Sequence, residues 1–432
     1  MRQALASLTL RGRSFVAAGA AAMVCSVLLG EAVLLSIGTL LVVLPLAAAV
    51  VIARARYRLA AKRILEAPHV PAGHEAAVTL VVENLSRLPT GLLLVEEVVP
   101  YQLGSAPRFV LDRVEAHGVR EIGYQLRSET RGRYDVGPLT VRLADPFGLV
   151  ELTRSFTRVD KLVVTPTVHQ LPSVPLTGAW TGGGDSHART IAAAGEDDAA
   201  TREYRHGDDL RRVHWKSTAK RGELMVRREE QHWQTRCTIL LDSRHRAYHG
   251  EGPGSAFEFA VSAAASIGVA MARDGFGLRL VTDAGATVAG HGGLPDGGSG
   301  PTERLLLEEL AMIRASRRLR LVDGHARRGL ADASDSLLVA ILGTLDDRDL
   351  DEVTGLRHGR GTGVAVLVDS ASWASTRVHS AEVDGYERTV DRLQAAGWRV
   401  VPVRHGTSLA KVWRLAGGGP ATPAATSAGA DR

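Results

Sequence analysis

The chain has 432 residues, a formal net charge of +5, 45% hydrophobic residues and 23% charged residues. It is long enough for two or three domains, and its composition is ordinary for a globular protein. Two cysteines, Cys25 and Cys237, exclude a disulfide framework and fit a reducing compartment.

Two apolar runs open the chain, SFVAAGAAAMVCSVLL (14–29) and AVLLSIGTLLVVLPLAAAVVIA (32–53), and only Gly30 and Glu31 separate them. The second run is long enough to span a bilayer, and a lipid-embedded helix tolerates its proline. The positive-inside rule places both basic ends in the cytoplasm. We therefore predict a transmembrane hairpin with basic flanks over residues 1–64, in a multi-pass cell-membrane protein with cytoplasmic soluble domains. A cleaved signal peptide is the alternative, but it leaves the second run and its basic flank unexplained. The basic residues are Arg2, Arg11, Arg13, Arg54, Arg56, Arg58, Lys62 and Arg63.

Residues 65–166 change to short β-branched runs, such as AAVTLVVEN and LTVRLADP, broken by Gly, Pro and Asn. Alternating inward and outward positions at this spacing predict an antiparallel β-sandwich of immunoglobulin-like type. The segment from Asp145 to Gly148 is interpreted as a turn with a hydrophobic plug that staples a β corner, in preference to a binding site.

Residues 167–232 are predicted to be a linker followed by a charged segment. Three glycines at 182–184 could form a phosphate nest, but no strand precedes them and no GK[ST] follows, so a flexible linker is the default. From residue 195 the chain becomes dense in Arg, Lys, Asp and Glu, interleaved with aromatic residues.

Arginines and carboxylates in such number leave water cheaply only when they pair with one another. One interpretation of the charged segment is therefore a self-satisfying network that locks an irregular stretch between two domains. Another is a surface on which a partner protein or a phosphate-bearing ligand docks, and a third is a catalytic role. The candidate partner-binding residues are Arg202, Glu203, Tyr204, Gly207, Asp208, Arg211, Arg212, His214, Trp215 and Lys216.

The stretch REYRHGDDLRRVHWKSTAKRGELMVRREE (202–230) resembles the signature of the family called domain of unknown function 58. The run RGRYDVGPLTVRLADPFGL (131–149) is similar to a second segment of that family. The resemblance implies that a von Willebrand factor A-like domain follows the signature. It also implies partnership with a MoxR-type AAA+ ATPase and often with a transglutaminase-like membrane protein. It implies no established biochemical activity.

Residues 233–416 alternate buried apolar strands with amphipathic helices, which predicts a doubly wound α/β sheet. Strands are expected at 236–242, 276–282, 336–344, 362–369 and 398–404, with helices between them. The tail, 417–432, is rich in Ala, Thr and Pro and is predicted to be disordered.

Asp242 closes the first of these strands, where open α/β sheets bind ligands. Domains of the type that the resemblance implies place D-x-S-x-S there to hold Mg²⁺, but here Arg244 and Arg246 replace the two serines. A guanidinium has no lone pair to give and repels a divalent cation, so the site is interpreted as degenerate. Asp242 is expected to pair with an arginine, and Asp346 and Asp347 are expected to be surface or capping residues.

These observations favour a membrane-anchored, cytoplasm-facing interaction scaffold that uses no cofactor and binds no metal. Enzyme motifs such as HExxH and GxSxG are absent from the sequence, and its basic residues form no acid-free stripe for nucleic acid. Two alternatives remain open. One is a hydrolase or metal-dependent enzyme built on Asp242, His214 and Glu203, and the other is an extracytoplasmic adhesion module.

Overall fold

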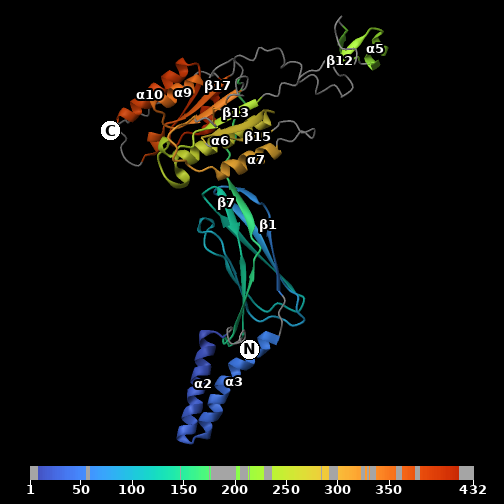
Figure 1. The fold of residues 1–432 in the computed structure, drawn as a ribbon, viewed down its shortest axis with the longest axis vertical. Helices are drawn as coiled ribbons and strands as arrows, with labels where there is room; N and C mark the ends of the chain where they lie inside the picture. The colour runs from blue at the N-terminus through green and yellow to red at the C-terminus, as the bar shows by residue number, and fades with distance from the viewer. Residues whose placement is uncertain are drawn as a thin grey trace, which may run out of the picture. The chain divides into compact units, whose positions relative to one another are not determined.

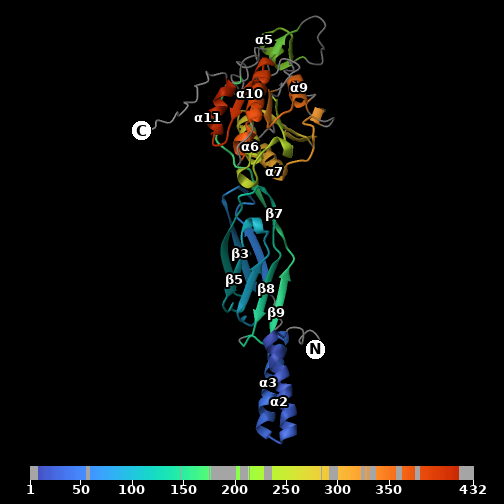
Figure 2. The same cartoon turned by 90° about the vertical axis from the view of Figure 1, so that its left-hand side faces the viewer.

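The structure, a computed structural model, divides into two compact units (Figures 1 and 2). One contains residues 1–167 together with 307–313, and the other contains the rest of the chain. Much of the predicted linker, five of the ten candidate partner-binding residues and the predicted tail from 418 onward lie outside the described residues. The structure describes residues 8–54, 59–145, 147–174, 176, 201–204, 213, 215–227, 236–283, 285–290, 300–322, 326–327, 330, 337–356, 362–374 and 380–417.

Two apolar helices, α2 (Leu10–Leu29) and α3 (Ala32–Arg54), pack together as a hairpin (Figure 1). Gly30, with φ 71°, ends α2 in the left-handed conformation that a tight turn needs. The helices approach closely at Gly19 and Gly38, because a Cβ on Gly19 would lie 2.7 Å from the carbonyl oxygen of Gly38. Both helices are long and apolar enough to cross a membrane, which confirms the predicted apolar hairpin. The side of the membrane that the soluble units occupy stays a prediction.

Short strands build three sheets after the hairpin, as the alternating apolar pattern predicts. Two are antiparallel, with orders β1-β3-β6 and β5-β4-β8-β9, and the third has the order β2-β10-β7. One pairing departs from the antiparallel pattern, because β2 and β10 run parallel and join the beginning of the sandwich to its end. The strands are β1 (Leu59–Leu65), β2 (His69–Pro71), β3 (Glu75–Asn84), β4 (Leu93–Glu97), β5 (Arg108–Leu111), β6 (Val119–Arg127), β7 (Gly132–Val136), β8 (Leu139–Ala144), β9 (Glu151–Phe156) and β10 (Asp160–Thr165).

Strand β3 forms the middle of the sandwich core, because every second side chain along it is buried. Val78 packs in a cluster with residues of β2, β6, β7 and β10, whereas Leu80 and Val82 pack against β4 and β8. The sheet that contains β3 thus faces both other sheets, which is the two-layer packing of a sandwich.

The basic residues that follow α3 in the sequence continue into β1, the first strand of the sandwich. Arg63 lies in β1 with its side chain almost fully buried; its Nε donates to Oε1 of Glu97 at 2.6 Å and its Nη1 to Oδ2 of Asp160 at 2.8 Å. Burial raises the pKa of Glu97, and the adjacent guanidinium opposes that rise. This arginine is therefore part of a structural ion pair rather than a charge at the membrane surface.

The second unit contains the predicted parallel sheet, with strand order β15-β14-β13-β16-β17-β18. Five of these strands are parallel, and β15 is an antiparallel edge strand that pairs with β14. The short glycine-flanked run of β15 gave no strand signal in the sequence. The strands are β13 (Arg236–Leu241), β14 (Gly277–Thr282), β15 (Gly285–Gly290), β16 (Leu337–Leu342), β17 (Gly363–Val368) and β18 (Arg399–Val403).

Helices cover both faces of this sheet (Figure 1). Gly268 of α6 lies directly against Ile239 of β13 and Leu306 of α7, whereas Leu350 of α9 and Leu393 of α10 pack on the face that Leu240 presents. Helix α6 is also apolar enough to cross a membrane, but 72% of it is buried inside the fold, so it is a core helix. The helices are α6 (Ala256–Arg273), α7 (Gly300–Met312), α9 (Asp347–Gly355), α10 (Ser380–Ala395) and α11 (Leu409–Trp413), with 3-10 turns η3 (His245–Ala247), η4 (Gly252–Gly254), η5 (Ser370–Trp373) and η6 (Arg414–Gly417). A further 3-10 turn, η1 (Tyr101–Leu103), lies in the sandwich between β4 and β5.

We expect Cys237 to be inert in the folded protein. It lies in the middle strand of the sheet, and burial raises the pKa of its thiol to about 12. At pH 8 its thiolate population, and hence its rate of reaction with a maleimide, should fall on the order of 10³-fold below that of a free cysteine. A Cys25→Ser variant leaves Cys237 as the sole thiol, so mass spectrometry should find it unlabelled in the native state and fully labelled in denaturant. Rapid native labelling would contradict the burial.

Candidate functional site

The order of the parallel strands reverses at β13, which has β14 on one side and β16 on the other. Ligand sites in open α/β sheets lie beyond the carboxyl ends of the strands at this switch point. Asp242 follows β13 there, and its backbone N–H continues the ladder by donating to the carbonyl oxygen of Ile341 at 3.0 Å. The turn η3 comes next, so residues 242–247 occupy the switch point.

A buried charge cluster fills this position. The guanidinium of Arg244 donates from Nε to Oδ1 of Asp242 at 2.9 Å and from Nη2 to Oδ2 at 2.8 Å, a bidentate pair. Its third nitrogen, Nη1, donates to Oδ2 of Asp349 at 2.6 Å. The side chains of Asp242 and Arg244 are 0% exposed, and that of Asp349 is 5% exposed. The prediction that Asp242 pairs with an arginine is confirmed.

The second carboxylate reaches the cluster from helix α9. Asp346 caps this helix, because its Oδ1 accepts from the backbone N–H of Asp349 at 2.8 Å, and the two aspartates form a capping box. Arg246 then donates from Nη2 to both carboxylates, at 3.0 Å each. Asp346 is thus a capping residue, as predicted, and Asp347 is an exposed first-turn residue that pairs with Arg392 at 3.3 Å. Acidic side chains at a helix N-terminus also stabilise the helix, because they lie at the positive end of its dipole.

Burial sets the protonation chemistry of the cluster. It raises the pKa of Asp242 above its ordinary value, and the bonds from Arg244 oppose that rise. For Asp346 desolvation also acts upward, but the backbone N–H of Asp349 and the guanidinium of Arg246 lower its pKa overall. The pKa of Tyr248, which is buried beside the cluster, is raised by desolvation and then by Asp242.

These contacts limit what the site can do. Asp242 is inaccessible to a substrate and already accepts from Arg244, so it is a poor acid, base or nucleophile. A cation placed between Asp242 and Asp349 would meet the guanidinium that bridges them. Within the residues that the structure describes, no group of three or more His, Cys, Asp or Glu side chains is arranged to hold a metal ion.

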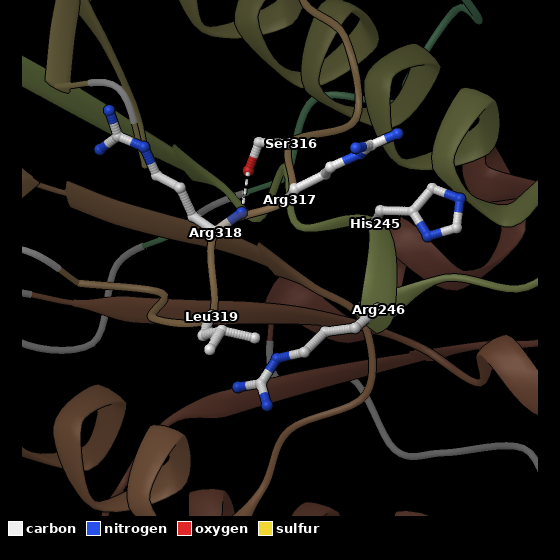
Figure 3. Close-up of a pocket in the computed structure, with 6 residues that line it drawn as sticks. All are labelled: His245, Arg246, Ser316, Arg317, Arg318 and Leu319. Carbon is white, nitrogen blue, oxygen red and sulfur yellow. Dashed lines mark hydrogen bonds between the residues drawn. The ribbon is translucent and has the colours of Figure 1, made fainter.

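A pocket of about 350 Å³ opens beside the cluster (Figure 3). Its two walls are joined by the backbone, because the N–H of His245 donates to the carbonyl oxygen of Ser316 at 2.7 Å. The residues that line it are His245, Arg246, Ser316, Arg317, Arg318 and Leu319.

The basic side chains of this pocket differ in what they contact. Arg246 donates to the carboxylates of Asp346 and Asp349, and Nη1 of Arg318 donates to the carbonyl oxygen of Asp283 at 2.5 Å. Arg317 and His245 are exposed and extend to the same side of the pocket in Figure 3. Of the cationic or titratable side chains that line the pocket, these two are the ones best placed to meet an anionic group from outside.

A separate small element holds the described part of the charged segment. Strand β11 (Thr201–Glu203) pairs antiparallel with β12 (Met225–Arg227), and helix α5 (Trp215–Arg221) lies between them in the chain. The buried residue Met225 donates its backbone N–H to Oγ1 of Thr218 at 3.0 Å. A strand–helix–strand unit was not predicted here, because its strands are only three residues long.

The structure brings some of the candidate partner-binding residues together. Arg202 and Glu203 lie in β11, the N–H of Tyr204 donates to the carbonyl oxygen of Leu224 at 2.8 Å, and Trp215 is 70% exposed at the start of α5. Lys216 also lies in α5. The others, Gly207, Asp208, Arg211, Arg212 and His214, lie outside the described residues.

Sequence reasoning missed Asp349, Arg317 and Arg318. The spacing of Asp346 and Asp349 matches a capping box and could have placed Asp349 in the first turn of α9. The loop at 316–318 carries no pattern that distinguishes it from a solvated basic stretch.

The fold and this cluster define a protein with an apolar helical hairpin, a β-sandwich and a doubly wound α/β unit whose switch point is closed by a buried arginine. Residues 200–317 match the family described as "Protein of unknown function DUF58", so the chain carries a DUF58 domain over these residues.

A curated relative is the uncharacterized protein YeaD of Bacillus subtilis (strain 168), which is 25% identical over 233 residues. The match covers 51% of this chain and 55% of the relative, so the chain spans about half the length of that protein. Similar solved structures include the CARDB domain of a Pyrococcus furiosus protein, with a TM-score of 0.19, 14% identity, and coverage of 25% of this chain and 86% of that one. Another is the Pseudomonas fluorescens alkylpurine DNA glycosylase AlkC, with a TM-score of 0.16, 16% identity, and coverage of 29% and 38%. Likenesses this low bear on neither fold nor function.

Proposed function

We propose that the protein is a membrane-anchored interaction scaffold, with cytoplasmic soluble units, that works with a MoxR-type AAA+ ATPase and with a transglutaminase-like membrane protein. The observation that favours a scaffold over an enzyme is the closed switch point, where Arg244 bridges Asp242 and Asp349, whereas the two partners are proposed from the family resemblance of residues 202–230. A site built for chemistry needs accessible acid, base or nucleophilic groups, whereas here the carboxylates of Asp242 and Asp349 are buried and bound by Arg244.

The α/β unit is proposed to be von Willebrand factor A-like. The support is its strand order, in which β13 stands in the middle, the antiparallel β15 lies at one edge and the remaining strands are parallel. In this proposal Arg244 takes the position that a bound cation would otherwise occupy. The partner ATPase is proposed to dock on the charged segment, with Arg211 and Arg212 in the contact.

The alternative enzyme built on Asp242, His214 and Glu203 finds no support in the contacts of Asp242, which is buried and bound by Arg244. The adhesion module differs from the scaffold in the side of the membrane. A Glu387→Cys variant in a Cys25→Ser background presents a thiol on an exposed position of α10. In intact cells an impermeant maleimide should leave it unlabelled if the unit is cytoplasmic.

Affinity purification of the intact protein from its own membrane tests the scaffold. We expect an AAA+ ATPase to co-purify with the wild type and to be reduced at least tenfold by Arg211→Ala combined with Arg212→Ala. The matched control is Arg388→Ala with Arg414→Ala, which removes the same charge from exposed positions elsewhere in the α/β unit and should keep the ATPase.

Other outcomes would redirect the proposal. If no ATPase accompanies the wild type, the proposed partnership is wrong. If the ATPase remains on the Arg211 and Arg212 variant but is lost from His245→Ala with Arg317→Ala, the pocket is the docking surface instead of the charged segment.

A further inference from the structure

One end of the β-sandwich presents large apolar side chains on its loops. Leu85, Leu88 and Leu92 lie in the connection between β3 and β4 and are 44%, 54% and 48% exposed. Phe147, in the connection between β8 and β9, is 63% exposed. Loops on a protein surface are usually polar, so four such side chains at one end of a domain indicate an interaction surface. We call these four residues the apolar loop tips.

The two loops lie at the same end because of the strand register. Asn84, at the end of β3, pairs with Leu59, and Leu93, at the start of β4, pairs with Leu143 of β8. The side-chain amide of Asn84 donates to the carbonyl oxygens of Leu88 at 2.8 Å and of Glu115 at 3.0 Å. The connections after β3, β5 and β8 therefore form one face.

This face is also the one at which the hairpin joins the sandwich. Helix α3 ends at Arg54 and β1 begins at Leu59, so an extended chain places Leu59 within roughly 18 Å of the helix end. The other helix contacts the face directly. Oγ1 of Thr9, the N-cap of α2, donates to the carbonyl oxygen of Gly148 at 2.7 Å, and its backbone N–H donates to that of Leu149 at 2.9 Å.

Close packing fixes this junction. A Cβ on Gly12 would overlap the carbonyl oxygen of Leu149, so α2 lies against the turn without an intervening side chain. Leu149 and Val150 are buried in a cluster with Leu8 and Ala49. The plug predicted within residues 145–148 is wrong, because Phe147, the large apolar residue of that segment, is 63% exposed, and the buried residue of the turn is Leu149.

The loops are ordered by polar contacts rather than by their leucines. Asn84 is fully buried and accepts from the N–H of Ser86 at 3.1 Å, and the hydroxyl of Ser86 donates to the carbonyl oxygen of Leu88 at 2.8 Å. In the other loop the carboxylate of Asp145 accepts from the N–H of Phe147 at 3.0 Å and of Val150 at 2.6 Å. Rigid backbones present the apolar side chains at little entropic cost on binding.

From these contacts we infer that the apolar loop tips rest in the headgroup and upper acyl region of the bilayer that the hairpin spans. The argument for lipid as the occupant is continuity. The loop that carries Phe147 adjoins the first turn of α2, whose Leu10 is exposed and whose Arg11 and Arg13 suit anionic headgroups, and the three leucines lie on the same face. The inference needs the hairpin to lie in a membrane but does not depend on any protein partner.

Fluorescence of full-chain variants with one accessible cysteine tests this, because the remaining Cys237 is buried. In a Cys25→Ser background, Leu88→Cys, Phe147→Cys and the control Tyr101→Cys are labelled with an environment-sensitive nitrobenzoxadiazole probe and reconstituted in phosphatidylcholine–phosphatidylglycerol vesicles. Tyr101 is equally suited to labelling, because it is 85% exposed, but it lies beyond β4 at the opposite end of the sandwich. We expect blue-shifted emission, quenched by a lipid spin-labelled near its headgroup, at positions 88 and 147 and not at 101.

Because an apolar probe can insert by itself, a second set of variants removes the natural side chains. Leu85→Asp with Leu88→Asp should weaken the quenching of the label at 147 at least twofold, whereas Tyr101→Asp should leave it unchanged. The inference fails if labels at 88 and 101 behave alike. It also fails if the blue shift appears in native membranes but not in pure lipid, because the surface would then belong to a protein partner.

Discussion

Replacing Arg244 with methionine is expected to lower the free energy of unfolding of the α/β unit by about 3–5 kcal/mol. The substitution keeps an unbranched apolar stem but removes the guanidinium, so it leaves two buried carboxylates, on Asp242 and Asp349, without the cation that bridges them. Urea unfolding of the full chain measures the loss of stability. Hydrogen exchange of the backbone amides in β13 and β16 shows that the loss lies in the parallel sheet.

The matched control is Arg246→Met, because Arg246 also donates to Asp349 but is partly exposed. Partly exposed ion pairs contribute little, so this variant should lose about 1 kcal/mol or less. Equal losses for the two variants would show that the buried cluster is not the source of the stability.

The pH dependence of the Arg244→Met variant has a definite sign. Burial raises the folded-state pKa of Asp242 above its unfolded value near 3.9, and removing the guanidinium removes the bonds that oppose this rise. A raised folded pKa means that the folded state binds more protons, so stability falls as pH rises through that pKa. The stability gap between wild type and variant should therefore be larger at pH 8 than at pH 5, and Asp242→Asn in the same variant should recover part of it.

The second large effect is expected in the sandwich, where Arg63→Met should also cost about 3–5 kcal/mol. The guanidinium of Arg63 bonds Glu97 and Asp160, and its loss leaves the buried carboxylate of Glu97 unpaired. Arg158→Met is the control, because Arg158 pairs with the same Asp160 at 3.2 Å from an exposed position and should lose about 1 kcal/mol or less.

The two large effects should appear in different parts of the molecule. Arg63 belongs to the first unit and Arg244 to the second, and a chain of two compact units need not unfold in one step. Hydrogen exchange on the full chain in lipid nanodiscs should therefore locate the loss from Arg63→Met in β1, β3 and β6, and the loss from Arg244→Met in the parallel sheet. A uniform loss over both units would contradict this division.

Periodicity predicted most of the architecture because it reflects burial. The apolar runs of the hairpin, the alternation in β3 and the continuous apolar strands β13, β16 and β17 each produce a distinct pattern in the sequence. Strand β15 and the β11–α5–β12 element were missed, because short strands next to glycine or charge give no such pattern.

The candidate site could be located but not completed from the sequence. Asp242 could be identified as a candidate site residue because it follows a predicted parallel strand. The arginines that replace the two serines indicated that an arginine would pair with it. Asp349 lies on a helix far along the chain and reaches Arg244 only through the crossover of β16 and α9. For Arg63 the sequence predicted the wrong environment. Its basic neighbours indicated the flank of a membrane helix, and only the strand pairing of β1 shows that its side chain is buried against Glu97.

The parallel pairing of β2 with β10 has a mechanical consequence. The chain enters the sandwich at Leu59, beside the hairpin, and leaves it at Thr165, which pairs with Pro71 beyond the far end of β1. A pull applied between Leu59 and Thr165 therefore runs along the strands and loads their ladders in shear. The ladder hydrogen bonds of β1 with β3 and of β10 with β7 then resist together rather than one after another. The sandwich is therefore built to resist tension that is applied between its two chain ends.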